Sequence, residues 1–142
     1  MSGHKKGVGL TFRRWVPTLV LMVLIAALSG PAFSFVNTGH VLDQIEQHLG
    51  LTLSDSTADL IHIVVRKGAH FILYGSLFLV LSRGPLRNRP MLAVAACIAV
   101  AALDEFHQSF LPERSASFYD VMLDTSGALF SRFAYGVWFG PW

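Results

Sequence analysis

Residues 104–124 read DEFHQSFLPERSASFYDVMLD and contain most of the polar chemistry of this sequence. The stretch joins two apolar runs, 91–103 and 121–138, which we interpret as parts of two membrane helices. A carboxylate near hydrocarbon must lose water, find a partner or take up a proton, so acids at this place indicate a functional site. Pro112 is expected to end the first helix and to begin a turn. The sequence therefore predicts that the acids of the two helices face each other across one short hairpin.

The composition favours a small integral membrane protein over a soluble domain. Of the 142 residues, 53% are hydrophobic and only 14% are charged, which leaves too little polar surface for a soluble fold. The net charge of +2 is too small to indicate nucleic-acid binding, and the basic residues flank apolar runs. The single cysteine, Cys97, lies among Ala and Val and is expected to pack as a small hydrophobic residue.

The distribution of apolar runs predicts one all-α domain over residues 1–142, an up-down bundle of four transmembrane helices. The first run has features of a signal peptide, but it continues past Pro31, so we favour a retained span. A short amphipathic helix at 41–49 is expected within the outer loop. The spans are expected at about 15–36, 61–81, 90–110 and 119–138, with the outer loop at 37–60.

Lys and Arg residues are unevenly distributed among the connections. The amino terminus and the 82–90 connection together hold seven of them, whereas the 37–60 loop holds none. The positive-inside rule then predicts that both termini and the 82–90 connection lie in the cytoplasm. A shared polar recess is therefore expected near the outer leaflet. It would be formed by Arg66, Lys67, His70 and Tyr74 of the second span, Asp104, Glu105 and Gln108 of the third, and Asp120 and Asp124 of the fourth.

Two groups of motifs resemble the VanZ-like family of bacterial membrane proteins. They are RKGAHFILY at 66–74 and, over 104–127, DEFHQ, Pro112, RSAS, Asp120 and Gly127. The resemblance covers about residues 15–135 and implies a multi-pass protein of the bacterial inner membrane. The name-giving member is associated with low-level resistance to the glycopeptide teicoplanin. Two departures are that the family usually has Asn in place of Asp124 and commonly Gly in place of Glu113. The first departure adds a possible negative charge to the centre of the expected site.

The expected ligand is an anionic envelope-lipid or lipid-linked cell-wall-precursor head group. Lys67, His70 and Tyr74 are spaced to face one groove. Arg114, with the unpaired backbone N–H groups that open the last helix, could hold a phosphate or carboxylate. The candidate ligand-binding residues are Arg66, Lys67, His70, Tyr74, Asp104, Gln108, Arg114, Ser115, Ser117, Asp120 and Asp124.

Two alternatives remain open from the residues alone. In the first, Asp104 and Glu105 act with His70 in acid–base or metal-assisted chemistry on a lipid-linked phosphate. No HExxH-like signature is present, so we expect no metal and no cofactor. In the second, the chain is a structural or accessory membrane subunit whose polar residues only lock the helices together, at about 0.6 kcal/mol for each hydrogen bond. His62 is assigned no role.

Overall fold

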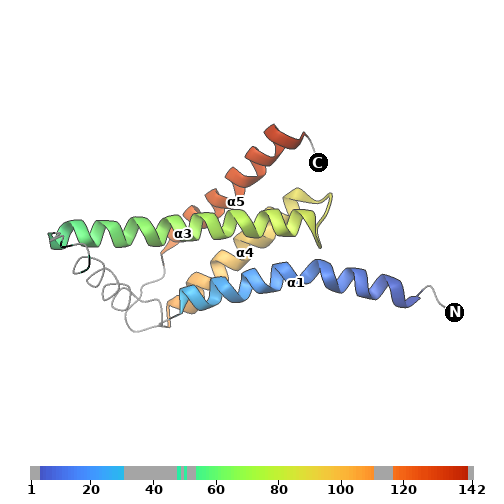
Figure 1. Cartoon of the computed structure of the whole chain (residues 1–142), viewed down its shortest axis with the longest axis horizontal. Helices are drawn as coiled ribbons and strands as arrows, with labels where there is room; N and C mark the ends of the chain where they lie inside the picture. The colour runs from blue at the N-terminus through green and yellow to red at the C-terminus, as the bar shows by residue number, and fades with distance from the viewer. Residues whose placement is uncertain (1–3, 31–47, 49, 51–53, 111–116, 141–142) are drawn as a thin grey trace.

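The part of the chain that can be described is built from four helices (Figure 1). The computed structural model describes residues 4–30, 48, 50, 54–110 and 117–140, with the side chains of residues 4–12 excepted. The helices are α1 (His4–Ser29), α3 (Asp55–Arg83), α4 (Pro90–Gln108) and α5 (Phe118–Phe139). In chain order they alternate in direction, so that the predicted all-α class is confirmed for these residues.

Membrane-compatible length and hydropathy are found in two of these helices, α3 and α4. Large apolar side chains cover much of the outer surface of the helices, and Trp138 near the end of α5 is 81% exposed. Such broad apolar exposure is unusual for a soluble monomer and is expected of a surface that faces lipid.

The helix ends follow local signals. Pro90 occupies the first position of α4, where its missing N–H costs nothing and its fixed φ suits the helix. Ser54 precedes α3, and Asp55 in the first turn interacts favourably with the helix dipole. At the other end of α3 the Gly84 N–H donates to the Val80 carbonyl at 2.9 Å. Both α4 and α3 therefore begin at residues whose chemistry favours a helix start.

The helices and the predicted spans differ at several boundaries. Residues 55–60, placed in the outer loop, are the first turns of α3, because Ser54 and Asp55 start the helix ahead of the apolar run. α1 begins at His4, ahead of the span expected at 15–36, and α4 ends at Gln108, within the span expected at 90–110. The remainder of the first span, 31–36, lies outside the described residues, as does most of the expected amphipathic helix.

The core forms where α3 meets the other helices. Tyr74, Leu77, Phe78 and Leu81 of α3 are buried there. The remaining core residues are Ile25 of α1, Ala93, Val94, Cys97 and Ala101 of α4, and Ala128 of α5. Cys97 is completely buried among them, which confirms that it packs as a small hydrophobic residue.

α3 and α5 run in the same general direction but cross at an angle, and they approach most closely at two glycines. A Cβ atom on Gly127 would lie 3.0 Å from the carbonyl carbon of Phe71 and closer still to its oxygen. A Cβ atom on Gly75 would lie 3.2 Å from the Gly127 carbonyl oxygen. Only glycine allows two helix backbones to pass at this distance. The crossing sets the register that places Lys67 and His70 of α3 beside the first turns of α5.

Candidate functional site

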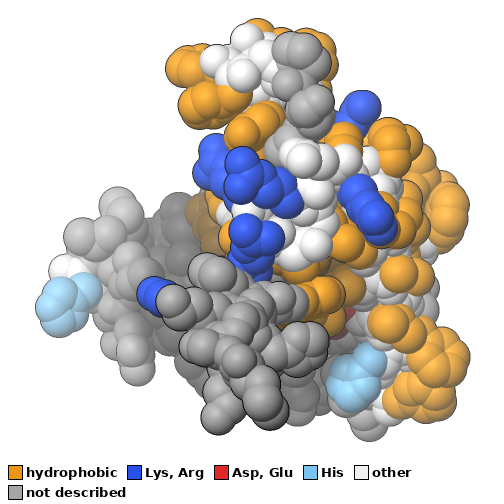
Figure 2. Space-filling model, turned by 90° about the vertical axis from the view of Figure 1, so that its right-hand side faces the viewer, with side chains coloured by type: hydrophobic (Ala, Val, Ile, Leu, Met, Phe, Trp, Pro, Cys, Tyr) orange, Lys and Arg blue, Asp and Glu red, His pale blue; other side chains and the backbone are white. Residues whose placement is uncertain are grey.

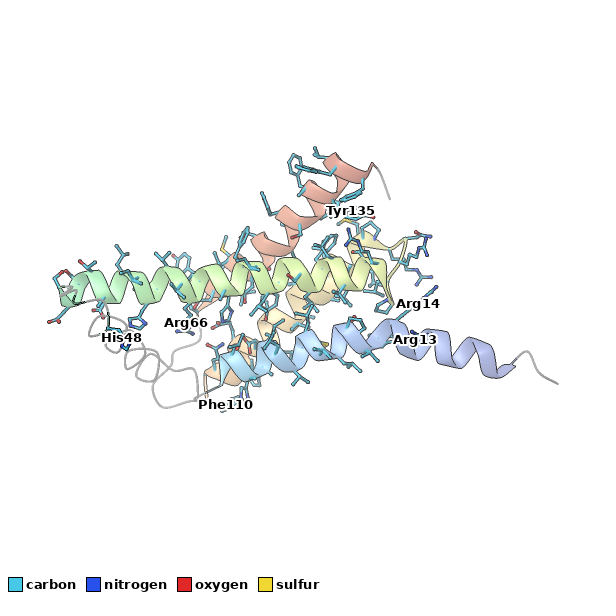
Figure 3. The ribbon with its side chains drawn as sticks, viewed as in Figure 1. Arg13, Arg14, His48, Arg66, Phe110 and Tyr135 are labelled. Carbon is cyan, nitrogen blue, oxygen red and sulfur yellow. The ribbon has the colours of Figure 1, made fainter. Side chains whose placement is uncertain are left out.

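The polar side chains of the helices gather at one end of the bundle. This end contains the last turns of α1 and α4, the opening turns of α5 and the part of α3 before its crossing with α5. Figure 3 shows Arg66 and Phe110 toward this end and Arg13, Arg14 and Tyr135 toward the other. We call it the polar end.

Lys67 and Asp120 form the outermost contact between α3 and α5 at the polar end. The Lys67 Nζ lies 2.6 Å from Asp120 Oδ1, and the two side chains are 48% and 25% exposed. Because solvent reaches both groups, the pair contributes at most about 1 kcal/mol to stability. An anionic ligand can therefore compete with Asp120 for the ammonium group at little cost.

His70 and Asp124 form a second, buried pair one turn deeper. The His70 Nδ1 lies 3.4 Å from both Asp124 carboxylate oxygens, and the side chains are 11% and 1% exposed. This distance is long for a hydrogen bond. Asp124 Oδ1 has no hydrogen-bond donor among the described residues. The Asp124 carboxylate is therefore only partly satisfied and can accept one more hydrogen bond.

Asp104 is held on the α1 side of the bundle. Its Oδ2 accepts a hydrogen bond from Ser29 Oγ at 2.6 Å and one from Gln108 Nε2 at 3.0 Å. Gln108 in turn accepts a hydrogen bond from Arg66 Nη2 at 3.3 Å. A neutral amide thus stands between the guanidinium and the carboxylate, and Asp104 does not cancel the charge of Arg66 by direct pairing.

Glu105 connects the end of α4 to the start of α5. Its Oε2 accepts a hydrogen bond from the Ser117 backbone N–H at 2.7 Å. Ser117 is the N-cap of α5, so the carboxylate satisfies a donor next to the positive end of the helix dipole. Glu105 therefore anchors the start of α5 and is not bonded to His70.

A pocket opens between α3 and α5 with a volume of about 60 Å³. This is room for a few water molecules or one compact anionic group. Its walls are His62, Ile63, Arg66, Lys67 and His70 of α3 and Asp120, Leu123 and Asp124 of α5. Arg66 is half-buried here, and within the described part of the chain no carboxylate lies within ion-pair distance of it. The pocket wall therefore holds one cation without an ion-pair partner, a second that is weakly paired, and the carboxylates of Asp120 and Asp124.

The structure brings most, though not all, of the predicted site residues together. Arg66, Lys67, His70, Asp120 and Asp124 line the pocket, while Asp104 and Gln108 lie behind Arg66 and Ser117 caps α5. Tyr74 stacks on His70 at 6.3 Å between ring centroids but is fully buried in the core, where its hydroxyl has no described hydrogen-bond partner. Arg114 and Ser115 lie outside the described residues.

Two polar residues of this end were missed by the sequence analysis. Ser29 donates to Asp104, and His62, which was assigned no role, lines the pocket. His62 lies four residues before Arg66, so helical spacing was a usable signal for it. Ser29 carried no comparable signal, because its partner is seventy-five positions away.

The described side chains do not form a metal centre. Among them, no group of three or more His, Cys, Asp and Glu residues is placed to hold a metal ion. His70, Asp104 and Glu105 point their polar atoms to three different partners. The polar atoms of these three described side chains therefore do not converge on one point.

Comparison with known proteins gives one match. The family model described as VanZ/LLP1 matches residues 11–139, which is nearly the whole chain. No curated protein and no solved structure matches the chain.

Proposed function

Because this chain belongs to the VanZ/LLP1 family, we propose that it is a four-span protein of the bacterial inner membrane with an anion-binding pocket on its outer side. The pocket between α3 and α5 binds the head group of an anionic envelope lipid or of a lipid-linked cell-wall precursor. Both termini and the connection between α3 and α4 lie in the cytoplasm.

The alternation of helix directions supports this topology. It brings the amino terminus, the connection between α3 and α4 and the end of α5 to one end of the molecule. The exposed Arg13, Arg14, Arg83, Arg87 and Arg89 belong to this end. The positive-inside rule assigns such an end to the cytoplasm, which leaves the polar end on the outside.

The observation that carries the anion proposal is the state of Arg66. Its guanidinium is half-buried, donates to the neutral Gln108 at 3.3 Å and lies on the pocket wall beside Lys67. A cation removed from water without a charged partner is stabilised by an incoming anion. A phosphate oxygen in the pocket would accept hydrogen bonds from Arg66 and from Lys67, with Asp120 released from the exposed pair.

The pocket also suits a lipid-linked group because its rim is apolar. Ile63 and Leu123 line it, and the neighbouring Leu60 and Val64 of α3 are about 60% exposed. A head group can enter between the helices while its chain lies along this face. A protein that holds a precursor head group changes how much of it is free at the outer surface. Through that change, a link to teicoplanin susceptibility like that of the family's name-giving member would extend to this chain.

The test compares two variants that lose the same charge. Purified protein with Arg66→Gln should retain undecaprenyl phosphate, measured by native mass spectrometry, about tenfold less well than wild type, because a charge-assisted contact is lost. Arg87→Gln, at the other end, should retain it as wild type does. Equal retention by wild type and Arg66→Gln would refute the pocket proposal.

A second candidate is an enzyme, favoured by the His70 and Asp124 pair on the pocket wall. With Asp124 orienting its ring, His70 would take a proton from a water that attacks the terminal phosphorus of a bound lipid pyrophosphate, which releases inorganic phosphate and leaves the lipid monophosphate. Asp104 and Glu105, the acids first considered for this role, are engaged with Ser29 and Ser117. Asp124→Asn should then keep lipid binding and lose phosphate release from a lipid pyrophosphate. Absence of phosphate release from the wild type would exclude this candidate.

A further inference from the structure

A second hollow lies at the opposite end of the molecule, between α1 and α3. It has a volume of about 290 Å³ and is lined by Arg14, Pro17, Leu79, Val80, Arg83 and Gly84. We call it the α1–α3 groove. Two cations and an apolar wall therefore share one open groove, far along α3 from the pocket described above.

The two arginines of the α1–α3 groove have no anionic partner in the described chain. Both are exposed, and no described carboxylate lies within ion-pair distance of either. The sequence explains why: all nine Asp and Glu residues lie within 43–59 and 104–124, so none occurs near the groove in α1 or in the second half of α3. Figure 2 faces this end and shows Lys and Arg side chains gathered beside hydrophobic ones.

Arg83 is also held in place. Its guanidinium carbon lies 5.0 Å from the ring centroid of Tyr135 and 5.7 Å from that of Phe139. These rings of α5 orient the guanidinium through cation–π contacts and leave its positive charge uncancelled. A fixed guanidinium loses less conformational entropy when it binds a phosphate than a free one does.

The shape of the groove is fixed by a close contact of helix backbones. A Cβ atom on Gly84 would lie 2.8 Å from the carbonyl oxygens of both Arg14 and Val80. α1 and the end of α3 therefore touch where Gly84 meets the Arg14 backbone, and Arg83 is the residue before Gly84. From there the wall continues along α3 through Val80 and Leu79, which are both apolar and half-buried.

We propose that the α1–α3 groove binds an anionic phospholipid of the inner leaflet. The phosphate contacts Arg14 and Arg83, and one acyl chain lies against Pro17, Leu79 and Val80. The apolar wall and the larger volume favour a lipid over free inorganic phosphate, because a free phosphate would leave the wall uncovered. This inference rests on the membrane topology proposed above and does not depend on the α3–α5 pocket.

The test measures retained phosphatidylglycerol by native mass spectrometry after purification from vesicles of phosphatidylglycerol and phosphatidylcholine. Arg14→Gln with Arg83→Gln should lower the retained phosphatidylglycerol at least tenfold, since two charge-assisted contacts to the lipid phosphate are lost. Arg87→Gln with Arg89→Gln removes the same charge outside the groove and should leave retention unchanged. An equal loss in both double variants would mean a general surface-charge effect and would overturn the proposal.

A third variant tests the apolar wall with all charges intact. Val80→Trp fills the groove and should lower phosphatidylglycerol retention, while circular dichroism confirms that the helices are kept. Unchanged retention would overturn the proposed acyl contact. Displacement of the lipid by millimolar inorganic phosphate would mean that the groove binds only the phosphate, and would also overturn the proposal of a phospholipid site. Arg66→Gln should leave this retention as in wild type, so failure here is distinguishable from failure of the outer pocket.

Discussion

The two ends of this molecule use basic residues in opposite ways. At the polar end, Lys67 and His70 each lie beside a carboxylate of α5, and Arg66 is joined to Asp104 through Gln108. At the other end, Arg14 and Arg83 line one groove with apolar residues, Arg83 also lies beside two aromatic rings, and no carboxylate is among these described contacts. Charges that are paired inside the protein fix how the helices pack. Charges without an internal partner are available to bind an anionic ligand. The polar end contains basic residues of both kinds, because Arg66 has no carboxylate partner there.

The largest loss of stability is expected at the glycine contact between α3 and α5, which positions the polar end. Gly127→Leu should destabilise the protein by at least about 4 kcal/mol, because the side chain would meet the Phe71 backbone and separate α3 from α5. Thermal unfolding in detergent measures the change.

Gly136→Ala is the matched control on the same helix. A Cβ atom there meets nothing within 4 Å, so the change should be neutral or stabilising by up to about 1 kcal/mol. Equal tolerance of both substitutions would show that the close glycine crossing does not set the distance between the helices.

The buried pair comes next. His70→Leu should cost about 3 kcal/mol, since Asp124 would be left buried without a partner. The double variant His70→Leu with Asp124→Leu should recover most of that stability, as chemical unfolding would show. If the double variant also retains lipid as wild type does, the His70 and Asp124 pair serves only helix packing. The pair would then contribute nothing to ligand binding at the polar end.

A smaller loss is expected where α1 joins the polar end. Ser29→Ala removes the 2.6 Å hydrogen bond to Asp104 and should cost about 1–2 kcal/mol. Ser126→Ala, whose hydroxyl bonds only to the local Leu123 carbonyl and is exposed, should change stability by less than about 0.5 kcal/mol. Identical unfolding curves for the two variants would mean that α1 is not fastened through Asp104.

The smallest change in stability is expected for the exposed pair. Lys67→Gln should cost less than about 1 kcal/mol, and the difference from wild type should shrink further in high salt. Retention of an anionic lipid in the α3–α5 pocket should fall much more than stability does. A large stability loss with unchanged retention would assign Lys67 to packing and sharpen the contrast with Arg14 and Arg83.

Sequence reasoning reached the gathering of polar residues but not their partners. Helical spacing and the order of the helices sufficed to bring Lys67, His70, Asp120 and Asp124 to one end. The choice of Asp124 for His70, in place of Asp104 or Glu105, depends on how far each helix is rotated about its axis. That rotation is set by the contact of Gly127 with α3. Sequence periodicity shows which residues share one face of a helix, but it does not show which face of the neighbouring helix they contact.

The helix boundaries show a similar division. Pro90 marked the start of α4 correctly because its geometry acts within one turn. The start of α3 was placed too late because the apolar run was followed and the local signal of Ser54 and Asp55 was not. The contact of Ser29 with Asp104 joins residues distant in the chain, and no local pattern encodes it.

Because Cys97 is completely buried, the native protein should give no background in thiol labelling. It is the single cysteine of the sequence, so the wild-type surface presents no thiol to a maleimide. A cysteine introduced at the exposed Ser56 or at the exposed Arg87 would thus be the one reactive sulfur. A reagent that cannot cross the bilayer would then label position 56 in intact cells and position 87 only after lysis, if the two ends face opposite compartments.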